Sequence, residues 1–283
     1  MKMKYCLTCI FLCVTISINA QDSSLFILAN AKQQAKNYIE ASVLYERILF
    51  NTSDEQVAYK AIMGKIQCLK QAHDFVKAKL YIKANINLLT KDSFKTNLFQ
   101  EWVTCTYLSN DLEETLSLIE QAKTNYPNAD NNWLSFIKIL SLNEQNKWND
   151  ARIEYKAWLV KNKLDSNEVN IYQYKPRLKS ESRAQWLSTV IPGGGQFYVG
   201  KPWEGLMAVL IQASCVWYGV ASFENKYYLS AWFIGGGLFG SFHQGSVRRV
   251  EELARQYNKR KSSAFNTVLR NQIITNFQKR LSL

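Results

Sequence analysis

Apolar residues recur at helical spacing through the first half of the chain. Between residues 22 and 165 they lie three or four positions apart, and Pro127 is the only proline in that stretch. The pattern also repeats with a period of about 37 residues. The repeat is marked by small residues 37, 37 and 36 positions apart, which are Ala41, Ala78, Thr115 and Ala151. This spacing predicts an all-α solenoid of repeated helix pairs over residues 21–165.

The residues around each small position share a frame. Three positions earlier the chain has a large apolar residue, Tyr38, Phe75, Leu112 or Trp148. Four positions later it has Tyr45, Ile82, Ile119 or Tyr155, and ten positions earlier a small residue, Ala31, Cys68, Cys105 or Ser141. Small residues on both helices let two backbones approach while the large ones fill the adjoining groove. One such pair cannot bury its apolar face, so we expect the pairs to stack.

This frame resembles the tetratricopeptide repeat. Residues 38–45 and 148–155 are similar to the core of its second helix, and Tyr126-Pro127 is similar to its closing proline. The resemblance covers about half the chain, with a spacing longer than the family's usual 34 or so. It implies a concave groove that holds a peptide or a partner protein. The alternative is a spacer in which every aromatic side chain belongs to the core.

Cys68 and Cys105 occupy equivalent positions in successive repeats, which would suit a disulfide. Neighbouring packed helices lie about 8–10 Å apart, however, whereas a disulfide needs Cα atoms within about 7 Å. We therefore interpret both cysteines as small packing residues.

The first 20 residues have the pattern of a signal peptide. Lys2 and Lys4 precede an apolar run, and Ala20 precedes a polar segment, so we expect cleavage after Ala20 and export to the periplasm. A lipoprotein signal at Cys13 is the competing interpretation, but Leu12 is not the small residue that such a signal needs before its cysteine.

A different pattern begins near residue 186. The 60 residues 186–245 hold four charged side chains, Lys201, Glu204, Glu224 and Lys226. Two uncharged stretches of 19 residues, 205–223 and 227–245, flank a three-residue turn. Each would span about 28 Å as a helix, close to the thickness of a bilayer core, so we predict an antiparallel membrane hairpin. Gly236 and Gly240 form a small-xxx-small pair suited to helix packing. A buried hairpin of a soluble domain is the alternative.

Eleven of the 12 glycines lie between Gly193 and Gly245, and several belong to one motif at the start of this region. Its residues, interpreted as a bend where the chain enters the membrane, are Pro192, Gly193, Gly195, Gln196, Tyr198, Gly200 and Gly205. Proline ends the preceding helix, glycine permits positive φ, and a tyrosine ring suits the headgroup level. The motif resembles a domain of unknown function in envelope proteins of Gram-negative bacteria and, more distantly, a two-transmembrane-helix domain. Neither resemblance implies a reaction.

The net charge of +12 is concentrated beside the apolar region. Residues 21–174 carry 18 bases and 18 acids, while residues 175–185 contribute +3 and residues 246–283 contribute +7. We interpret residues 166–185 as a basic linker and residues 246–283 as two amphipathic helices on a lipid surface. The bases expected to contact lipid headgroups are Arg248, Arg249, Lys259, Arg260 and Lys261. Nucleic acid is the usual alternative partner, and export argues against it.

The basic flanks conflict with the positive-inside rule, which would place them in the cytoplasm. Either the signal peptide overrides the rule, or the hairpin lies in the outer membrane or partly in the interface, or the export prediction is wrong. We favour the inner membrane.

Signals for enzyme chemistry are weak. Residues 195–202 match seven positions of a phosphate-binding loop, but Pro202 replaces its hydroxyl residue and no apolar strand precedes it. His73 and His243 stand apart from any nucleophile or metal-ligand pattern. We therefore expect a non-enzymatic, membrane-anchored periplasmic adaptor without cofactor or metal, which binds a protein partner through its repeats. The alternatives are a structural subunit of an envelope transport or secretion complex and an envelope hydrolase.

Overall fold

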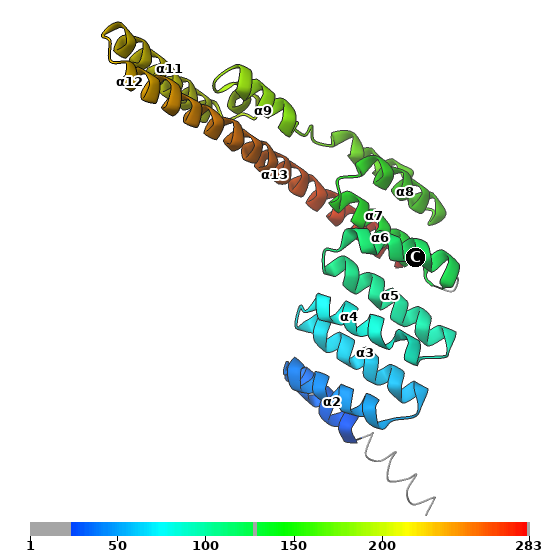
Figure 1. The fold of residues 1–283 in the computed structure, drawn as a ribbon. Coiled ribbons are helices and arrows are strands. Elements are labelled where there is room, and N and C mark those ends of the chain that lie inside the picture. The colour runs from blue at the N-terminus through cyan, green and yellow to red at the C-terminus, as the bar shows by residue number, and fades with distance from the viewer. Residues whose placement is uncertain (1–23, 127–128, 282–283) are drawn as a thin grey trace, which may run out of the picture. The chain divides into compact units, whose positions relative to one another are not determined.

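A computed structural model describes residues 24–126 and 129–281, and every element in those ranges is helical (Figure 1). The all-α prediction is confirmed. Contacts divide the chain into two compact units, residues up to Ser166 and residues from Asn167 onward, called unit 1 and unit 2 here. The predicted signal peptide, residues 1–20, and the closing proline Pro127 lie outside the described residues.

Unit 1 is a succession of helices in which each packs against the next (Figure 1). A first helix covers residues 24–34. It is followed by α2 (Tyr38–Asn51), α3 (Glu55–Gln71), α4 (Phe75–Asn85), a 3₁₀ turn (Ile86–Leu88), α5 (Asp92–Leu108), α6 (Leu112–Asn125), α7 (Asn131–Glu144) and α8 (Trp148–Lys161).

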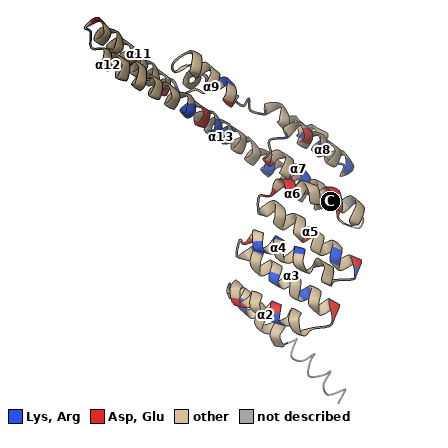
Figure 2. Cartoon of the chain, viewed as in Figure 1, with Lys and Arg blue, Asp and Glu red and all other residues tan. Residues whose placement is uncertain are grey.

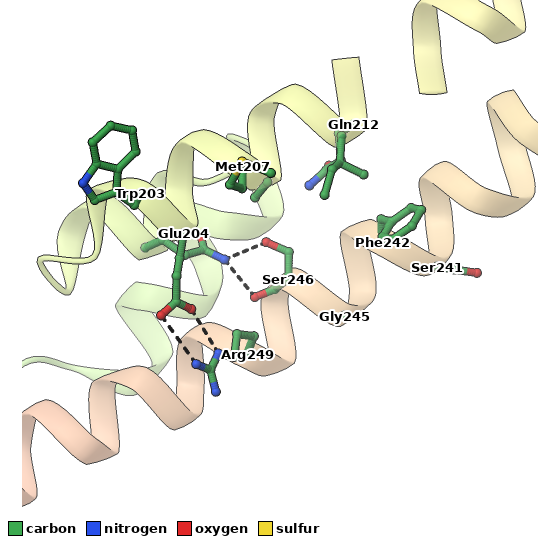
Figure 3. A pocket seen from close by; sticks show the side chains of 12 residues that line it. Trp203, Glu204, Met207, Gln212, Ser241, Phe242, Gly245, Ser246 and Arg249 are labelled. Carbon is green, nitrogen blue, oxygen red and sulfur yellow. Dashed lines mark hydrogen bonds and ion pairs between the residues drawn. The ribbon is translucent and has the colours of Figure 1, made fainter. Parts of the chain in front are cut away.

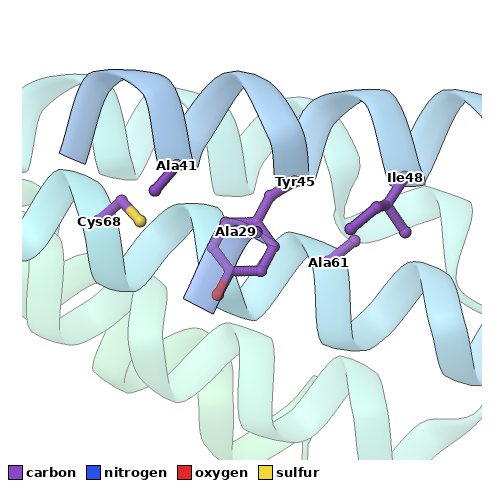
Figure 4. Packing of buried hydrophobic residues seen from close by; sticks show 6 residues of the cluster. All are labelled: Ala29, Ala41, Tyr45, Ile48, Ala61 and Cys68. Carbon is purple, nitrogen blue, oxygen red and sulfur yellow. The ribbon is translucent and has the colours of Figure 1, made fainter. Parts of the chain in front are cut away.

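The small positions of the repeat pattern lie in the core of unit 1. Their side chains are fully buried at Ala41, Ala78, Thr115 and Ala151. The large residues four positions later are buried as well, and Ala41 and Tyr45 belong to one cluster with Cys68 (Figure 4). The predicted packing position at Ala31 is wrong, because Ala31 is exposed. The buried small residue of the first helix is Ala29. Ala29 faces α2 and α3 because it lies half a turn away from Ala31 on the first helix.

Cys68 and Cys105 are free, buried thiols, as the packing argument predicted. Burial raises the pKa of Cys68 to about 11 and that of Cys105 to about 12, because a thiolate is poorly solvated in the core. Both thiols are therefore protonated at neutral pH.

The same period recurs in the turns between helices, which sequence reasoning missed. Five positions before each small residue the backbone adopts a left-handed conformation, with φ of 60°, 57°, 62° and 59° at Lys36, His73, Asn110 and Asn146. At each site the next amide donates to the carbonyl five residues earlier, as Asn37 does to Lys32 at 2.9 Å. This is the hydrogen bond of a Schellman helix end. The following helix is then capped by the side chain of Asn37, Asp74 or Asp111 in the first three repeats.

Unit 2 contains a 3₁₀ segment (Ser166–Tyr174), α9 (Glu181–Val190), α10 (Gly194–Tyr198), α11 (Pro202–Glu224), α12 (Tyr228–Ser230), a π-helical segment η3 (Ala231–Leu238) and α13 (Phe239–Leu281) (Figure 1). The expected linker, residues 166–185, is therefore largely helical, and its second part begins α9.

Two expectations about unit 2 are corrected. The second uncharged stretch, residues 227–245, is divided among α12, η3 and the start of α13. Gly235, Gly236 and Gly237 lie in η3, where missing side chains allow the wider π turn. The basic tail forms one continuous helix of 43 residues with the preceding segment, where two separate helices were expected.

Candidate membrane-facing site

The glycine motif forms a helix, a bend and a second short helix. α9 ends at Val190, two residues before Pro192, and α10 begins after Gly193, whose φ is +77°. A Cβ at Gly193 would also lie 2.4 Å from the carbonyl oxygen of Gly205, so this turn requires glycine on both counts. Gly200, with φ of +79°, ends α10 in the same left-handed conformation.

Gly195 brings α10 against α9. A Cβ there would lie 2.2 Å from the carbonyl oxygen of Ala184 and 2.4 Å from Ser188 Oγ. The absence of that carbon lets the Gly195 amide donate to Ser188 Oγ at 3.1 Å, while Ser188 Oγ donates to Gln196 Oε1 at 3.0 Å. Gln196 Nε2 then donates to Ser246 Oγ at 2.7 Å, which joins the motif to α13 (Figure 3).

Tyr198 contacts the residues at the beginning of α9. Its hydroxyl accepts from the Ser180 amide at 3.2 Å, and the Lys179 ammonium lies 4.6 Å from the centre of its ring. The Lys179 backbone is held in turn by Asn258 of α13, which accepts from the Lys179 amide at 2.7 Å. The motif is thus the point at which α9, α10 and α13 are joined.

The apolar face of the basic tail is occupied by these same helices. Val250, Leu253 and Ala254 are buried in a cluster with Ala184 and Val199. The expectation that this face lies on lipid is therefore wrong for this part of α13, because α9 and α10 already cover it. The apolar face of this part of α13 therefore packs within the protein.

Unit 2 exposes a large apolar surface on α11 and on the segment that follows it. Exposed large residues on α11 are Trp203, Leu206, Met207, Leu210, Val216, Trp217, Tyr218, Val220 and Phe223. Beyond the turn they continue with Tyr227, Tyr228, Leu229, Trp232, Phe233, Leu238 and Phe242. Charged residues are confined to the ends of α11, at Glu204 and Glu224 (Figure 2). In the part of the chain that the structure describes, α11 is the one helix long and apolar enough to cross a membrane.

α11 and η3 approach most closely at Gly219 and Gly235. A Cβ on Gly219 would lie 2.7 Å from the Cα of Gly235, so either side chain would force the backbones apart. Gly236 and Gly240 were predicted to pack helices, but a Cβ at either position would meet no atom within 4 Å in the described residues. The close crossing with α11 is therefore made by Gly235, and the packing of Gly236 and Gly240 on a neighbouring helix stays a prediction.

A cavity of about 470 Å³ lies between α11 and α13 (Figure 3). At one end Glu204 forms an ion pair with Arg249, with 3.1 Å between Oε2 and Nε. Deeper along α11, Gln212 is 2% exposed, and its Oε1 lies 3.0 Å from His243 Nδ1. Gln212 Nε2 is buried without a hydrogen-bond partner in the described chain. The wall is otherwise mainly apolar, with Met207, Ala208 and Ile211 among its residues.

The bases predicted to contact headgroups have different surroundings. Arg248, Lys259, Arg260 and Lys261 are exposed on α13, whereas Arg249 is held by Glu204. Sequence reasoning missed Lys201, which lines a separate pocket with Arg260. Its position four residues before the uncharged stretch 205–223 was the available signal, because a base there lies close to the end of a predicted span.

No group of His, Cys, Asp and Glu side chains within residues 24–126 and 129–281 is arranged to hold a metal ion. Comparison with protein-family models, with curated proteins and with solved structures finds no match.

Proposed function

We propose that the protein is a non-enzymatic, membrane-anchored adaptor of the cell envelope, in which unit 2 fixes the chain to a membrane and unit 1 holds a partner protein. The observation that carries the proposal is the exposed apolar surface of α11, η3 and the start of α13. Soluble monomers rarely expose contiguous apolar patches of more than a few hundred Å². The surface here extends along a 23-residue helix and its partner segment.

The dimensions of α11 support the same conclusion. Its 23 residues extend about 35 Å, slightly more than the roughly 30 Å of a bilayer core. Trp203 lies at one end, and Phe223 and Tyr227 lie at the other. Aromatic side chains favour these interfacial positions. We infer that α11 crosses the membrane and that η3 with the start of α13 returns beside it, with the repeat unit in the periplasm.

A candidate surface for the partner lies on unit 1. The residues two positions before and after the small repeat position are exposed and apolar in the first two repeats. They are Ile39 and Val43 of α2 and Val76 and Leu80 of α4, called the α2–α4 patch here. The equivalent residues of α6 are Glu113 and Ser117, so the patch ends there. The patch therefore comprises one helix in each of the first two repeats, and we infer that the partner contacts both helices.

The first arm of the test is extraction of the full-length protein from washed membranes. Alkaline carbonate removes peripheral proteins, so we expect it to leave the protein in the pellet, and a mild detergent to release it. Release by carbonate alone would rule out a membrane-crossing α11. A Val216→Arg variant places a charge on the exposed face of α11, and a Val43→Arg variant places the same charge on unit 1. Only Val216→Arg should weaken membrane retention.

The second arm places a photo-crosslinking residue at Val76, in the α2–α4 patch, or at Glu113, the equivalent position of α6. An adaptor should give one discrete protein adduct from Val76 in intact cells and little from Glu113. Absence of an adduct at Val76, with membrane attachment intact, would reject partner binding at this patch. A structural subunit of a transport or secretion complex would instead give adducts from η3 positions such as Gly236.

A further inference from the structure

A second pocket lies beside the first residue of α11. Its volume is about 380 Å³, and its lining residues are Val199, Gly200, Lys201, Leu253, Gln256, Tyr257 and Arg260. Val199 and Leu253 are buried and form an apolar floor. Gly200 also lines the pocket, and a Cβ at this position would meet no atom within 4 Å.

Two bases border this pocket without an ion pair. Lys201 and Arg260 are exposed, and neither forms a salt bridge with an acid among the residues that the structure describes. Two other bases of α13 do form ion pairs, Arg249 with Glu204 and Arg255 with Glu181. Glu252 contacts one lining residue of the pocket, Gln256, from which it accepts a hydrogen bond at 2.9 Å.

Further positive charge surrounds Tyr257, another lining residue. The ammonium groups of Lys179 and Lys261 lie 5.8 Å and 5.9 Å from the centre of the Tyr257 ring. The pocket thus combines two unpaired bases, a concentration of positive charge and an apolar floor. This combination suits a phosphate group that carries an apolar chain, because guanidinium and ammonium groups both bind phosphate oxygens.

We propose that this pocket binds the phosphate of an anionic phospholipid, with Lys201 and Arg260 contacting the phosphate oxygens. The inference rests on the proposed membrane anchoring, which places Lys201 at the headgroup level because Pro202 begins α11. The acyl chains would then lie against the exposed surface of α11, where the exposed Leu206 and Leu210 follow Lys201 by five and nine residues. A soluble phosphate would gain nothing from this apolar surface, which is why we assign the pocket to a lipid.

The test uses the full-length protein in detergent micelles and native mass spectrometry with added phosphatidylglycerol. The double variant Lys201→Gln/Arg260→Gln removes both bases from the pocket. Its matched control, Arg248→Gln/Lys259→Gln, removes the same charge from exposed positions on α13. We expect the pocket variant to lose affinity for phosphatidylglycerol about tenfold or more, and the control to change it less than about threefold. Equal losses in both variants would overturn the pocket in favour of diffuse attraction.

Two further arms separate the possible sources of the phosphate and the two proposals. Phosphatidylcholine should bind more weakly than phosphatidylglycerol, and millimolar inorganic phosphate should leave the lipid adduct intact. Displacement by inorganic phosphate would reassign the pocket to a soluble anion. Carbonate extraction of the pocket variant should match the wild type, because α11 is unchanged. If the pocket variant loses its preference for phosphatidylglycerol but stays attached to the membrane, the result supports the lipid-binding pocket. Release of the wild-type protein by carbonate would instead overturn the proposed membrane anchoring.

Discussion

In unit 1, the residue that ends the first helix of each repeat has a left-handed backbone conformation. Lys36, His73, Asn110 and Asn146 all follow the first helix of a repeat, and all close it with the same hydrogen bonds. Glycine is the residue most often found there, because other residues bring Cβ close to the carbonyl oxygen. Unit 1 nonetheless has Gly64 as its only glycine, and Gly64 serves a different purpose. A Cβ at Gly64 would lie 2.4 Å from the Tyr45 ring, so this glycine gives the large repeat residue room to pack.

The unfavourable conformation at Lys36 predicts that glycine stabilises unit 1. The left-handed conformation costs a lysine about 1–2 kcal/mol, and the greater freedom of glycine in the unfolded chain offsets about 0.4–1 kcal/mol of the gain. Lys36→Gly should therefore raise the unfolding free energy of unit 1 by about 0.5–1 kcal/mol, measured by urea denaturation followed by circular dichroism. Asn110→Gly is the control, and it should change stability less because asparagine tolerates this conformation. A loss of stability in Lys36→Gly would contradict the argument.

In unit 2, the backbones of α11 and η3 come into close contact where the two segments cross at Gly219 and Gly235. Each glycine occupies the space that a side chain on the other would need. Close backbone contact of this kind is a source of helix association in lipid, where the hydrophobic effect gives no preference between protein and lipid contacts. The crossing also occurs where the second segment is π-helical, which turns a different set of residues toward α11 than a regular α-helix would.

Alanine substitutions at the four glycines should separate the crossing from the neighbouring surface. Gly219→Ala and Gly235→Ala should each destabilise the detergent-purified protein by about 1–3 kcal/mol, because the added methyl group overpacks the contact. Gly236→Ala and Gly240→Ala should be neutral or slightly stabilising, since they meet open space and alanine favours helix. Thermal unfolding in one detergent measures all four variants. Equal destabilisation at Gly236 would mean that the helix-packing face predicted from the sequence is occupied after all.

Local patterns were predictable from the sequence, and contacts between distant elements were not. The burial of Ala41 and its equivalents follows from one helical period, which is visible in the chain itself. The crossing at Gly219 depends on how two helices are rotated about their axes, which no single-helix pattern specifies. The hydrogen bonds between the Asn258 side chain of α13 and the backbone of Lys179 join residues 79 positions apart, which no local pattern predicts. The pocket beside Lys201 likewise requires α13 to return to the start of α11.

The two units differ in where their large apolar residues lie. In unit 1 the large repeat residues such as Tyr45, Ile82 and Tyr155 are buried within the helix stack. In unit 2 the buried residues of α11 are Gly205, Gln212, Cys215, Gly219 and Ser222, while many of its large apolar residues are exposed. A helix with small or polar residues inside and large apolar residues outside fits lipid better than water. The charge follows the same division, since residues 21–174 are neutral and the bases of residues 175–185 and 246–283 flank the apolar surface.

This division predicts that unit 1 folds without the rest of the chain. A fragment of residues 21–166 should stay in solution without detergent and be strongly helical by circular dichroism, because the core of each helix pair lies within it. A fragment of residues 167–283 should require detergent, since it carries the exposed surface of α11. A shorter fragment that ends at residue 145 is the control, because it lacks α8 and uncovers the face of α7 that α8 packs against. That control should unfold at lower urea concentration or aggregate. Aggregation of residues 21–166 themselves would show that unit 1 depends on unit 2 for its core, and the proposed separation of partner binding from membrane anchoring would then fail.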